Sequence, residues 1–135
     1  MPNRIKVVII DDEPGNIVTL SELLKEYCPE LTIAGTASNP LAGFDLILQT
    51  QPEIVFLDIE MPFGNAFDFL DKFEQINFEV VFVTAFSNYA LKAIKYAALD
   101  YILKPVDSGE LQLAVEKAMK RLDEKSINTR IASLL

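Results

Sequence analysis

The chain of 135 residues contains no histidine and only one cysteine. Without histidine there is no histidine acid–base catalysis, no histidine metal ligation, no phosphohistidine carrier and no Ser-His-Asp or Cys-His nucleophile. The single cysteine, Cys28, cannot form a disulfide within the chain, which suits a reducing compartment. No apolar run approaches the ~18 residues of a membrane span, and Met1-Pro2-Asn3-Arg4 leads directly into a predicted strand, so no signal peptide is visible. We therefore expect a cytoplasmic protein with no membrane partner.

Basic residues are also scarce. There are 12 Lys and Arg against 20 Asp and Glu, which gives a formal net charge of −8. Because phosphate backbones are bound by clustered Lys and Arg, this chain alone is a poor nucleic-acid binder. Half of the residues are hydrophobic, which is enough to build the core of one domain.

Strand-like and helix-like segments alternate along the chain. Proline or a capping side chain predicts most of the helix starts: Pro14, Asn39 with Pro40, Asn65, Ser87 and Asp107. Residues 60–64 are predicted to form a loop. The predicted strands are 4–10, 31–37, 53–57, 79–84 and 100–103, and the predicted helices are 14–27, 40–50, 66–75, 87–98 and a final helix after residue 107.

This (βα)₅ pattern predicts an α/β fold with a doubly wound parallel sheet. The first, third and fourth strands are apolar nearly throughout, which indicates burial on both faces by helices. We expect a flavodoxin-like sheet with strand order 2-1-3-4-5. Residues 1–122 would form the domain. Residues 123–135 would extend the last helix or form a linker to an output domain that this chain lacks, with an apolar stripe at Ile127, Ile131 and Leu135.

Polar side chains stand at the ends of four predicted strands. Asp11 and Asp12 follow the first strand, Asp58 follows the third, Thr84 ends the fourth and Lys104 follows the fifth. Taken singly, each has an ordinary alternative, because acids before a helix complement its dipole and a lysine in a loop is commonly solvated. In a parallel sheet, however, these strand ends lie along one edge, where ligands bind.

The joint placement of these residues favours phosphoryl transfer. Three crowded carboxylates repel one another, and a divalent cation bound only by oxygen, Mg²⁺ or Mn²⁺, relieves that repulsion. Asp58 beside a metal is a carboxylate nucleophile that can accept a phosphoryl group as an acyl phosphate. Lys104 and the Thr84 hydroxyl can bind the phosphoryl oxygens.

Four stretches carry a resemblance to a known family: VIIDDEP (8–14), IVFLDIEMP (54–62), VTA (83–85) and LDYILKP (99–105). With these stretches the sequence resembles the response regulator receiver domains of two-component signalling, over residues 4 to about 122. The run Tyr89–Ala93, together with Ala98–Pro105, is similar to the LytTR-type subfamily, in which a receiver usually precedes a DNA-binding domain.

The resemblance implies a role for each matching residue. Asp58 would be the phosphoacceptor, and Thr84 and Lys104 would contact the phosphoryl group. Mg²⁺ would be bound by the Asp12 and Asp58 side chains, by Asp11 through water and by the Glu60 backbone carbonyl. Thr84 and Tyr101 would form the switch pair, and the Lys104–Pro105 peptide bond would be cis.

The resemblance also implies partners. A sensor histidine kinase would donate the phosphoryl group, and the chain would catalyse its own phosphorylation and dephosphorylation without turning over an external substrate. The surface of the fourth helix, fifth strand and fifth helix, including Lys92, Lys95, Tyr96 and Lys117, would then change its preferred partner. Homodimerisation could use this surface, and DNA would be bound only through the output domain.

Glu60 and Phe86 differ from the commonest receiver pattern. Each lies two residues after a site residue, and both are expected to flank the path of an attacking water. In addition, Phe63-Gly64-Asn65 replaces the usual glycine-rich loop.

Two other functions stay open. One alternative is an interaction module that keeps the fold but does not signal through phosphate. The other is a small aspartyl phosphatase, which the glutamate at position 60 and the lack of a cap domain disfavour.

Overall fold

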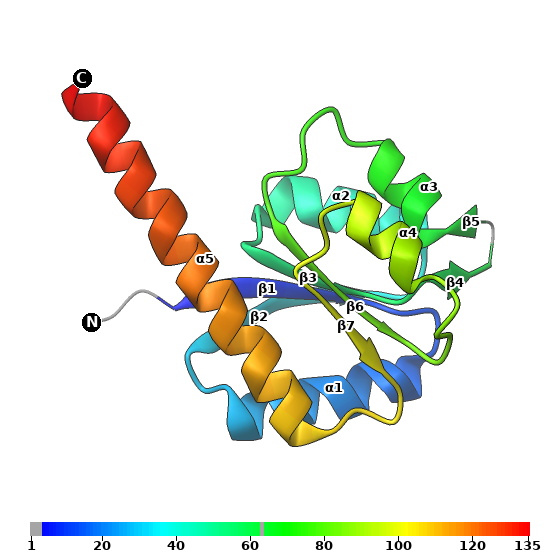
Figure 1. Cartoon of the computed structure of the whole chain (residues 1–135). Coiled ribbons are helices and arrows are strands. Elements are labelled where there is room, and N and C mark those ends of the chain that lie inside the picture. The colour runs from blue at the N-terminus through cyan, green and yellow to red at the C-terminus, as the bar shows by residue number, and fades with distance from the viewer. Residues whose placement is uncertain (1–3, 63) are drawn as a thin grey trace.

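The computed structural model describes residues 4–62 and 64–135, and it has three layers, with a parallel sheet between two layers of helices (Figure 1). No helix in these residues is long and apolar enough to cross a membrane. The strands are β1 (Ile5–Ile10), β2 (Leu31–Ala37), β3 (Ile54–Leu57), β4 (Glu60–Met61), β5 (Gly64–Asn65), β6 (Glu79–Thr84) and β7 (Asp100–Leu103). The helices are α1 (Pro14–Tyr27), α2 (Pro40–Thr50), α3 (Ala66–Asp71), α4 (Ala90–Lys95) and α5 (Ser108–Leu134).

The five main strands pair in the order β2-β1-β3-β6-β7, and every pair is parallel. This is the predicted order 2-1-3-4-5, because β4 and β5 form a separate two-stranded sheet. The flavodoxin-like doubly wound topology is therefore confirmed.

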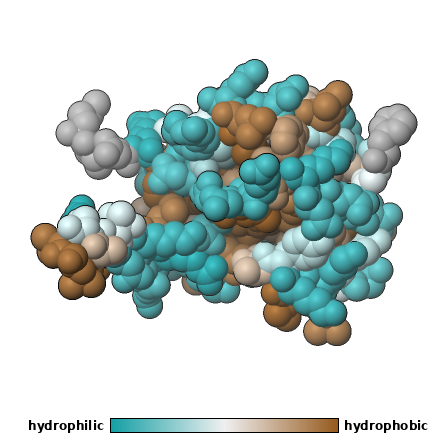
Figure 2. Space-filling model, turned by 90° about the horizontal axis from the view of Figure 1, so that it is seen from above, coloured by the Kyte–Doolittle hydropathy of each residue, from teal (hydrophilic) through white to brown (hydrophobic). Residues whose placement is uncertain are grey.

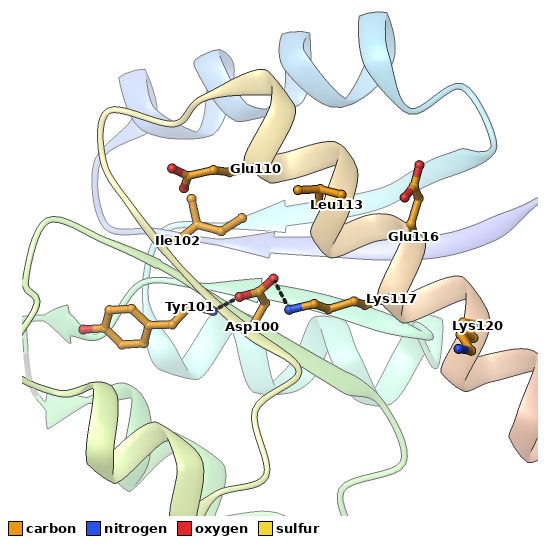
Figure 3. A pocket seen from close by; sticks show the side chains of 8 residues that line it. All are labelled: Asp100, Tyr101, Ile102, Glu110, Leu113, Glu116, Lys117 and Lys120. Atoms are coloured by element: carbon orange, nitrogen blue, oxygen red, sulfur yellow. Dashed lines mark hydrogen bonds and ion pairs between the residues drawn. The ribbon is translucent and has the colours of Figure 1, made fainter.

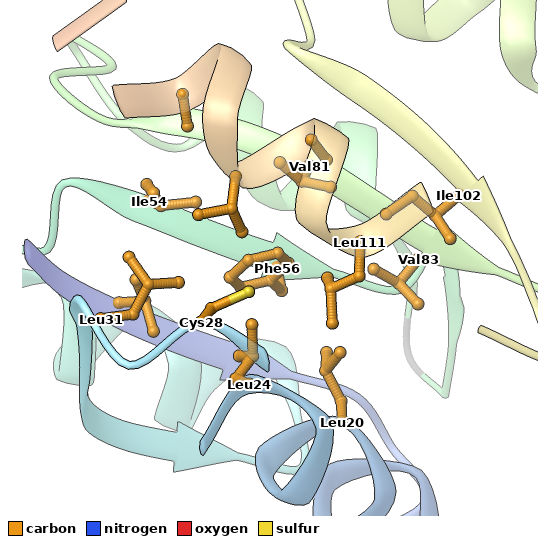
Figure 4. Close-up of a cluster of buried hydrophobic side chains, with 14 of the residues drawn as sticks. Leu20, Leu24, Cys28, Leu31, Ile54, Phe56, Val81, Val83, Ile102 and Leu111 are labelled. Carbon is orange, nitrogen blue, oxygen red and sulfur yellow. The ribbon is translucent and has the colours of Figure 1, made fainter. Parts of the chain in front are cut away.

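The sheet is buried on both faces because its strand residues alternate between two apolar clusters. On one face, Phe56 and Val81 pack against α1 and α5, where Leu24 and Leu111 are almost fully buried (Figure 4). On the other face, β-strand residues pack against α2, α3 and α4, with Phe67 of α3 in the cluster. Burial on both sides explains why β3 is apolar throughout and why β6 is apolar between Glu79 and Thr84.

The predicted capping residues begin three of the helices. Asn39 accepts a hydrogen bond from the Ala42 amide at 2.8 Å, and Asp107 accepts one from the Glu110 amide at 3.0 Å. Asn65 accepts from the amides of two residues in the first turn of α3, at 2.9 and 3.0 Å. Each side chain thus binds an amide that has no partner within the helix.

Two helices are shorter than predicted. Helix α3 ends at Asp71 instead of residue 75, because the Lys72 and Phe73 amides bond to carbonyls three residues back and the Phe73 ring turns inward. Helix α4 begins at Ala90 and ends at Lys95, so the predicted range 87–98 and the Ser87 cap are wrong. The chain before α4 bonds to Thr84 and Tyr101 instead, and Ala97 adopts a left-handed φ of 56° after it.

The segment predicted as a loop, 60–64, contains a short antiparallel pair. Glu60 pairs with Asn65 and Met61 with Gly64. Gly64 has a φ of 133°, a conformation that glycine adopts readily and that allows the tight reversal. Residue 63, part of the predicted loop variation, lies outside the described residues.

Helix α5 continues without interruption past residue 122 and projects beyond the sheet (Figure 1). Its apolar positions Ile127 and Ile131 are each 52% exposed, and Leu134 is 85% exposed. Figure 2 shows the resulting apolar tip at the end of the molecule. The predicted apolar stripe on the helix is therefore present and solvent-facing in this chain.

One buried carboxylate ties α5 to the start of β6. Glu79 is 4% exposed, and its oxygens lie 3.2 Å from Arg121 Nη1 and 2.6 Å from Lys125 Nζ. The two cations remain largely in water, so their pairing with Glu79 costs less desolvation than a fully buried pair. The contact therefore joins the middle of α5 to the start of β6.

We expect Glu79→Gln to lower the free energy of unfolding by about 1–2 kcal/mol, because a buried ionic contact with two partners is weakened. Asp100→Asn, which weakens the more exposed Asp100–Lys117 pair, should cost less than about 1 kcal/mol. Urea unfolding of both variants measures the difference. Equal effects would show that the Glu79 contact adds nothing beyond a surface ion pair.

Candidate functional site

The polar strand ends are brought together by the register of the sheet. Ile10 of β1 is paired with Leu57 of β3, and the Asp58 amide donates to the Ile10 carbonyl at 3.0 Å. At the other side, the Lys104 amide donates to the Thr84 carbonyl at 2.9 Å. Backbone bonds just past the strands therefore set the positions from which the predicted site side chains project.

Three carboxylates form a cluster at this edge. One oxygen from each of Asp11, Asp12 and Asp58 lies within 4.8 Å of the others. Asp11 is 5% and Asp58 7% exposed, so their charges are largely removed from water. A set of carboxylate oxygens fits Mg²⁺ or Mn²⁺ and does not fit zinc, which favours nitrogen and sulfur ligands. The cluster is therefore a suitable place for a hard divalent cation.

The Glu60 side chain is outside this cluster. Its Oε2 accepts a hydrogen bond from the Tyr89 hydroxyl at 3.3 Å. The predicted contact of Glu60 with the metal was through the backbone carbonyl, and that contact remains a prediction.

Lys104 lies against the acid cluster. Its Nζ is 2.7 Å from Asp11 Oδ2 and 3.1 Å from Asp58 Oδ2. Burial acts to lower the pKa of Lys104, but the hydrogen bond to Asp11 and the charge of Asp58 outweigh it, so the pKa is raised overall. Lys104 is therefore a cation at neutral pH and offsets part of the charge of the acids. The Lys104–Pro105 peptide bond that follows is cis.

The two buried carboxylates are oriented by hydrogen bonds from nearby groups. Asp11 Oδ1 accepts from the Glu13 amide at 2.9 Å and from Asn16 Nδ2 at 3.4 Å. Asp58 Oδ1 accepts from the Ile59 amide at 2.7 Å, which leaves Oδ2 directed to Lys104. Both side chains are thus held in place before any ligand binds.

Thr84 is fully buried and connects the site to Tyr101. The Thr84 hydroxyl accepts a hydrogen bond from the Phe86 amide at 3.3 Å. The Tyr101 hydroxyl in turn donates to the Phe86 carbonyl. The two residues predicted as a switch pair are therefore linked through one residue of the β6–α4 segment.

Two residues of the site were not predicted from the sequence. Asn16 orients Asp11 from the first turn of α1, and Tyr89 holds the Glu60 side chain. Asn16 has no local signal, because its partner is set by how the chain turns between β1 and α1. Tyr89 belongs to the run that resembles the LytTR-type subfamily, but nothing in that run indicates Glu60 as its partner.

Asp12 should make the free energy of unfolding depend on pH. Burial first, and then the charge of Asp11, raises the pKa of Asp12 above its ordinary value. An acid whose pKa is raised on folding destabilises the protein when ionised, and this cost vanishes below the unfolded pKa of about 3.9. In EDTA at pH 7, Asp12→Asn should therefore raise Tm by about 2–4 °C, and the gain should disappear near pH 3.

Thermal unfolding over that pH range checks this expectation. Asp45→Asn, on an exposed position of α2, is the matched control and should leave Tm nearly unchanged. Mg²⁺ should raise the Tm of the parent chain more than that of Asp12→Asn. If Asp12→Asn has a Tm no higher than that of the parent at pH 7, the ionised Asp12 carboxylate does not destabilise the fold.

Known proteins similar to this chain include two named regulators. The chain is 36% identical over 122 residues to the transcriptional regulatory protein BtsR of Escherichia coli, covering 90% of the chain and 49% of BtsR. It is 33% identical over 120 residues to the sensory transduction protein LytT of Enterococcus faecalis, covering 87% of the chain and 49% of LytT. The chain spans about half the length of the curated relatives it matches.

Solved structures share the fold. The response regulatory domain of protein mrkE from Klebsiella pneumoniae aligns with a TM-score of 0.80 at 24% identity, over 89% of this chain and 99% of that one. The family model described as the response regulator receiver domain matches residues 7–116, which is most of the chain. With its fold and its cluster of strand-end acids, this chain belongs to the receiver-domain family of two-component response regulators.

Proposed function

We propose that this chain is a cytoplasmic phosphorylation switch that accepts a phosphoryl group on Asp58 from the phosphohistidine of a sensor histidine kinase. The observation that carries the proposal is the convergence of three carboxylates with Lys104, whose Nζ lies 3.1 Å from Asp58 Oδ2. Such a site combines a nucleophile, an adjacent cation and ligands for a metal, which are the parts that phosphoryl transfer requires.

In the proposed transfer, Asp58 Oδ attacks phosphorus, a P–O bond forms and the P–N bond to the donor imidazole breaks. The imidazole nitrogen retains the bonding electrons and is reprotonated by solvent. Lys104 would follow the developing negative charge from Asp58 to the phosphoryl oxygens, and the Thr84 hydroxyl would bind another of these oxygens. The chain would thus catalyse its own phosphorylation and dephosphorylation and is not an enzyme acting on external substrates.

The site would hold Mg²⁺ through the Asp12 and Asp58 side chains, through Asp11 by way of water and through the Glu60 carbonyl, with Mn²⁺ as a substitute. When bound, the ion would neutralise the acids and stabilise charge on the phosphoryl oxygens. The donor set supports this assignment, because the three clustered side chains offer only oxygen.

The proposed output is a change in the surface formed by α4, β7 and α5. If the Thr84 hydroxyl turns to the phosphoryl group, its bond with the Phe86 amide is lost, and the segment that holds the Tyr101 hydroxyl is free to move. Tyr101 is among the residues that line the groove between α5 and β7, and Figure 3 shows its ring directed away from Leu113 and Glu116 of α5. Its ring can therefore reorient without breaking the Lys117–Asp100 contact of 3.2 Å. Binding partners would then select the shifted state.

Other residues of this surface make contacts that a shift of α4 would change. Lys92 Nζ lies 4.8 Å from the centre of the Phe67 ring, and the Tyr96 hydroxyl donates to Asp71 at 2.8 Å. Lys95, at the end of α4, is exposed to solvent. We propose this surface as the site of homodimerisation.

In the whole protein, the switch would control a DNA-binding output domain. The support is that the curated relatives are about twice as long as this chain, and that one of them is named a transcriptional regulatory protein. We propose that this output domain is of the LytTR type. Residues 1–122 would be the receiver, and residues 123–135 would be the connecting part of α5.

Titration with beryllofluoride, a phosphoryl mimic, tests the proposed function. Fluorine NMR should show a bound signal that requires both Mg²⁺ and Asp58, and amide signals near Thr84 and Tyr101 should shift. If Mg²⁺ at millimolar concentration causes no spectral change and no mimic binds, the chain is an interaction module that does not signal through phosphate. Turnover of a phosphomonoester would instead support the phosphatase alternative.

A further inference from the structure

A hydrogen bond links the segments that follow the two central site residues. Glu60 lies two residues after Asp58, and Tyr89 lies five residues after Thr84. The Tyr89 hydroxyl donates to Glu60 Oε2 at 3.3 Å. Because β3 and β6 are adjacent parallel strands, the segments that leave their ends run side by side, and this bond spans the gap between them.

Both ends of the bond are anchored. The Tyr89 ring packs 6.0 Å from the Phe67 ring and 6.4 Å from the Phe86 ring, the latter nearly perpendicular at 83°. The Tyr89 carbonyl accepts the amide of Ala93 in α4. The backbone of Glu60 is held by its pairing with Asn65. The Tyr89 ring and the Glu60 backbone are therefore both held, and the hydroxyl and the carboxylate meet near the surface.

The segment that carries Tyr89 is also attached to the site itself. The Phe86 amide donates to the Thr84 hydroxyl, and the Phe86 carbonyl accepts from the Tyr101 hydroxyl. The Phe86 ring, 40% exposed, stands beside Tyr89 at the same place. Two aromatic rings and a carboxylate thus lie on the two segments that leave the strand ends at Asp58 and Thr84.

We propose that Tyr89 is a positioning residue whose hydroxyl holds the Glu60 carboxylate across the gap between the two segments and so limits the access of water to phosphorylated Asp58. The inference rests on the proposed function of Asp58. In the hydrolysis that it slows, a water oxygen attacks phosphorus and the P–O bond to Asp58 breaks. Inorganic phosphate leaves, the Asp58 carboxylate is regenerated and the proton of the water passes to solvent.

Tyr89→Phe tests the inference because it removes only the hydroxyl and keeps the ring contacts. The chain is loaded with acetyl phosphate and Mg²⁺, the donor is removed, and the decay of the phosphorylated protein is followed by Phos-tag electrophoresis. We expect decay to be about fivefold faster in Tyr89→Phe, the rate equivalent of one net hydrogen bond.

Tyr27→Phe is the matched control. It removes the hydroxyl of a tyrosine at the end of α1, 38% exposed, outside the site and outside the proposed output surface. This variant should decay at the parent rate. Faster decay in both variants would show a general effect of losing a tyrosine hydroxyl and would contradict a specific role for Tyr89.

Glu60→Ala removes the acceptor of the same hydrogen bond and leaves the Glu60 backbone carbonyl unchanged. It should also decay about fivefold faster, and adding Tyr89→Phe to it should produce no further acceleration. Decay of Tyr89→Phe at the rate of the parent and of Tyr27→Phe would overturn the inference alone, as would full additivity of the two substitutions. Failure of the parent chain to become phosphorylated at all would overturn the proposed function and the inference with it.

Discussion

Asp58→Asn should lower phosphoryl incorporation from acetyl phosphate by about a hundredfold or more, to the background level. The amide oxygen carries no negative charge, so it is a far weaker nucleophile than the carboxylate. It also loses the ionic part of the contact with Lys104 Nζ, now 3.1 Å from Asp58 Oδ2. Incorporation is measured by Phos-tag electrophoresis in Mg²⁺ with acid-quenched samples.

The control for this experiment is Asp100→Asn, which neutralises a carboxylate on β7, two strands away from β3, that pairs with Lys117 outside the site. It should incorporate phosphate at the parent rate. Circular dichroism should show that both variants are folded. Incorporation that persists in Asp58→Asn would show that another residue accepts the phosphoryl group. Asp11 and Asp12 would then be the first candidates, because they are the other acids of the cluster in the described residues.

Lys104→Met should change two properties in opposite directions. The rate of phosphorylation should fall by about a hundredfold, because the cation that stabilises negative charge on the transferring group is lost. The affinity for Mg²⁺ should rise by about three- to tenfold. The Lys104 ammonium lies 2.7 Å from Asp11 and 3.1 Å from Asp58, and its positive charge repels a second cation bound to the same carboxylates.

Stopped-flow phosphorylation and a Mg²⁺ titration by NMR measure these two effects separately. Lys117→Met, which removes a lysine paired with Asp100 on the α5 side of β7, is the matched control and should alter neither property. A Lys104→Met variant that binds Mg²⁺ more weakly would show that Lys104 organises the acids more than it competes with the ion. An unchanged rate of phosphorylation would show that Lys104 does not stabilise the transferring phosphoryl group.

The main features of the site could be predicted from the sequence because they depend on the sheet. Strands buried on both faces are apolar, so the first polar residue after each marks the sheet edge. Asp58 follows β3 and Thr84 ends β6 for this reason. Parallel pairing then makes neighbours of residues far apart in the chain, as in the contact of Lys104 with Asp11 across 93 positions.

The segments between strands were predicted less well because side chains from elsewhere decide their structure. Ser87 has the residue type of a helix cap, but the adjacent Phe86 is bound by Thr84 and Tyr101 and does not enter a helix. Helix α3 ends early where the Lys72 and Phe73 amides bond to carbonyls three residues back, and the Phe73 ring packs on Phe44 and Phe78 from other segments. The bond between Tyr89 and Glu60 has the same origin, since it joins two loops that no local pattern relates.

Chemical location of the phosphoryl group is the most direct test of phosphorylation at Asp58. The chain is phosphorylated with acetyl phosphate and Mg²⁺ and reduced with borohydride, which converts phosphoaspartate to homoserine, and the product is sequenced by tandem mass spectrometry. We expect homoserine at position 58 and an unmodified aspartate at positions 11 and 12. An intact aspartate at position 58 under conditions that label the chain elsewhere, or no conversion at any position, would contradict phosphorylation at Asp58.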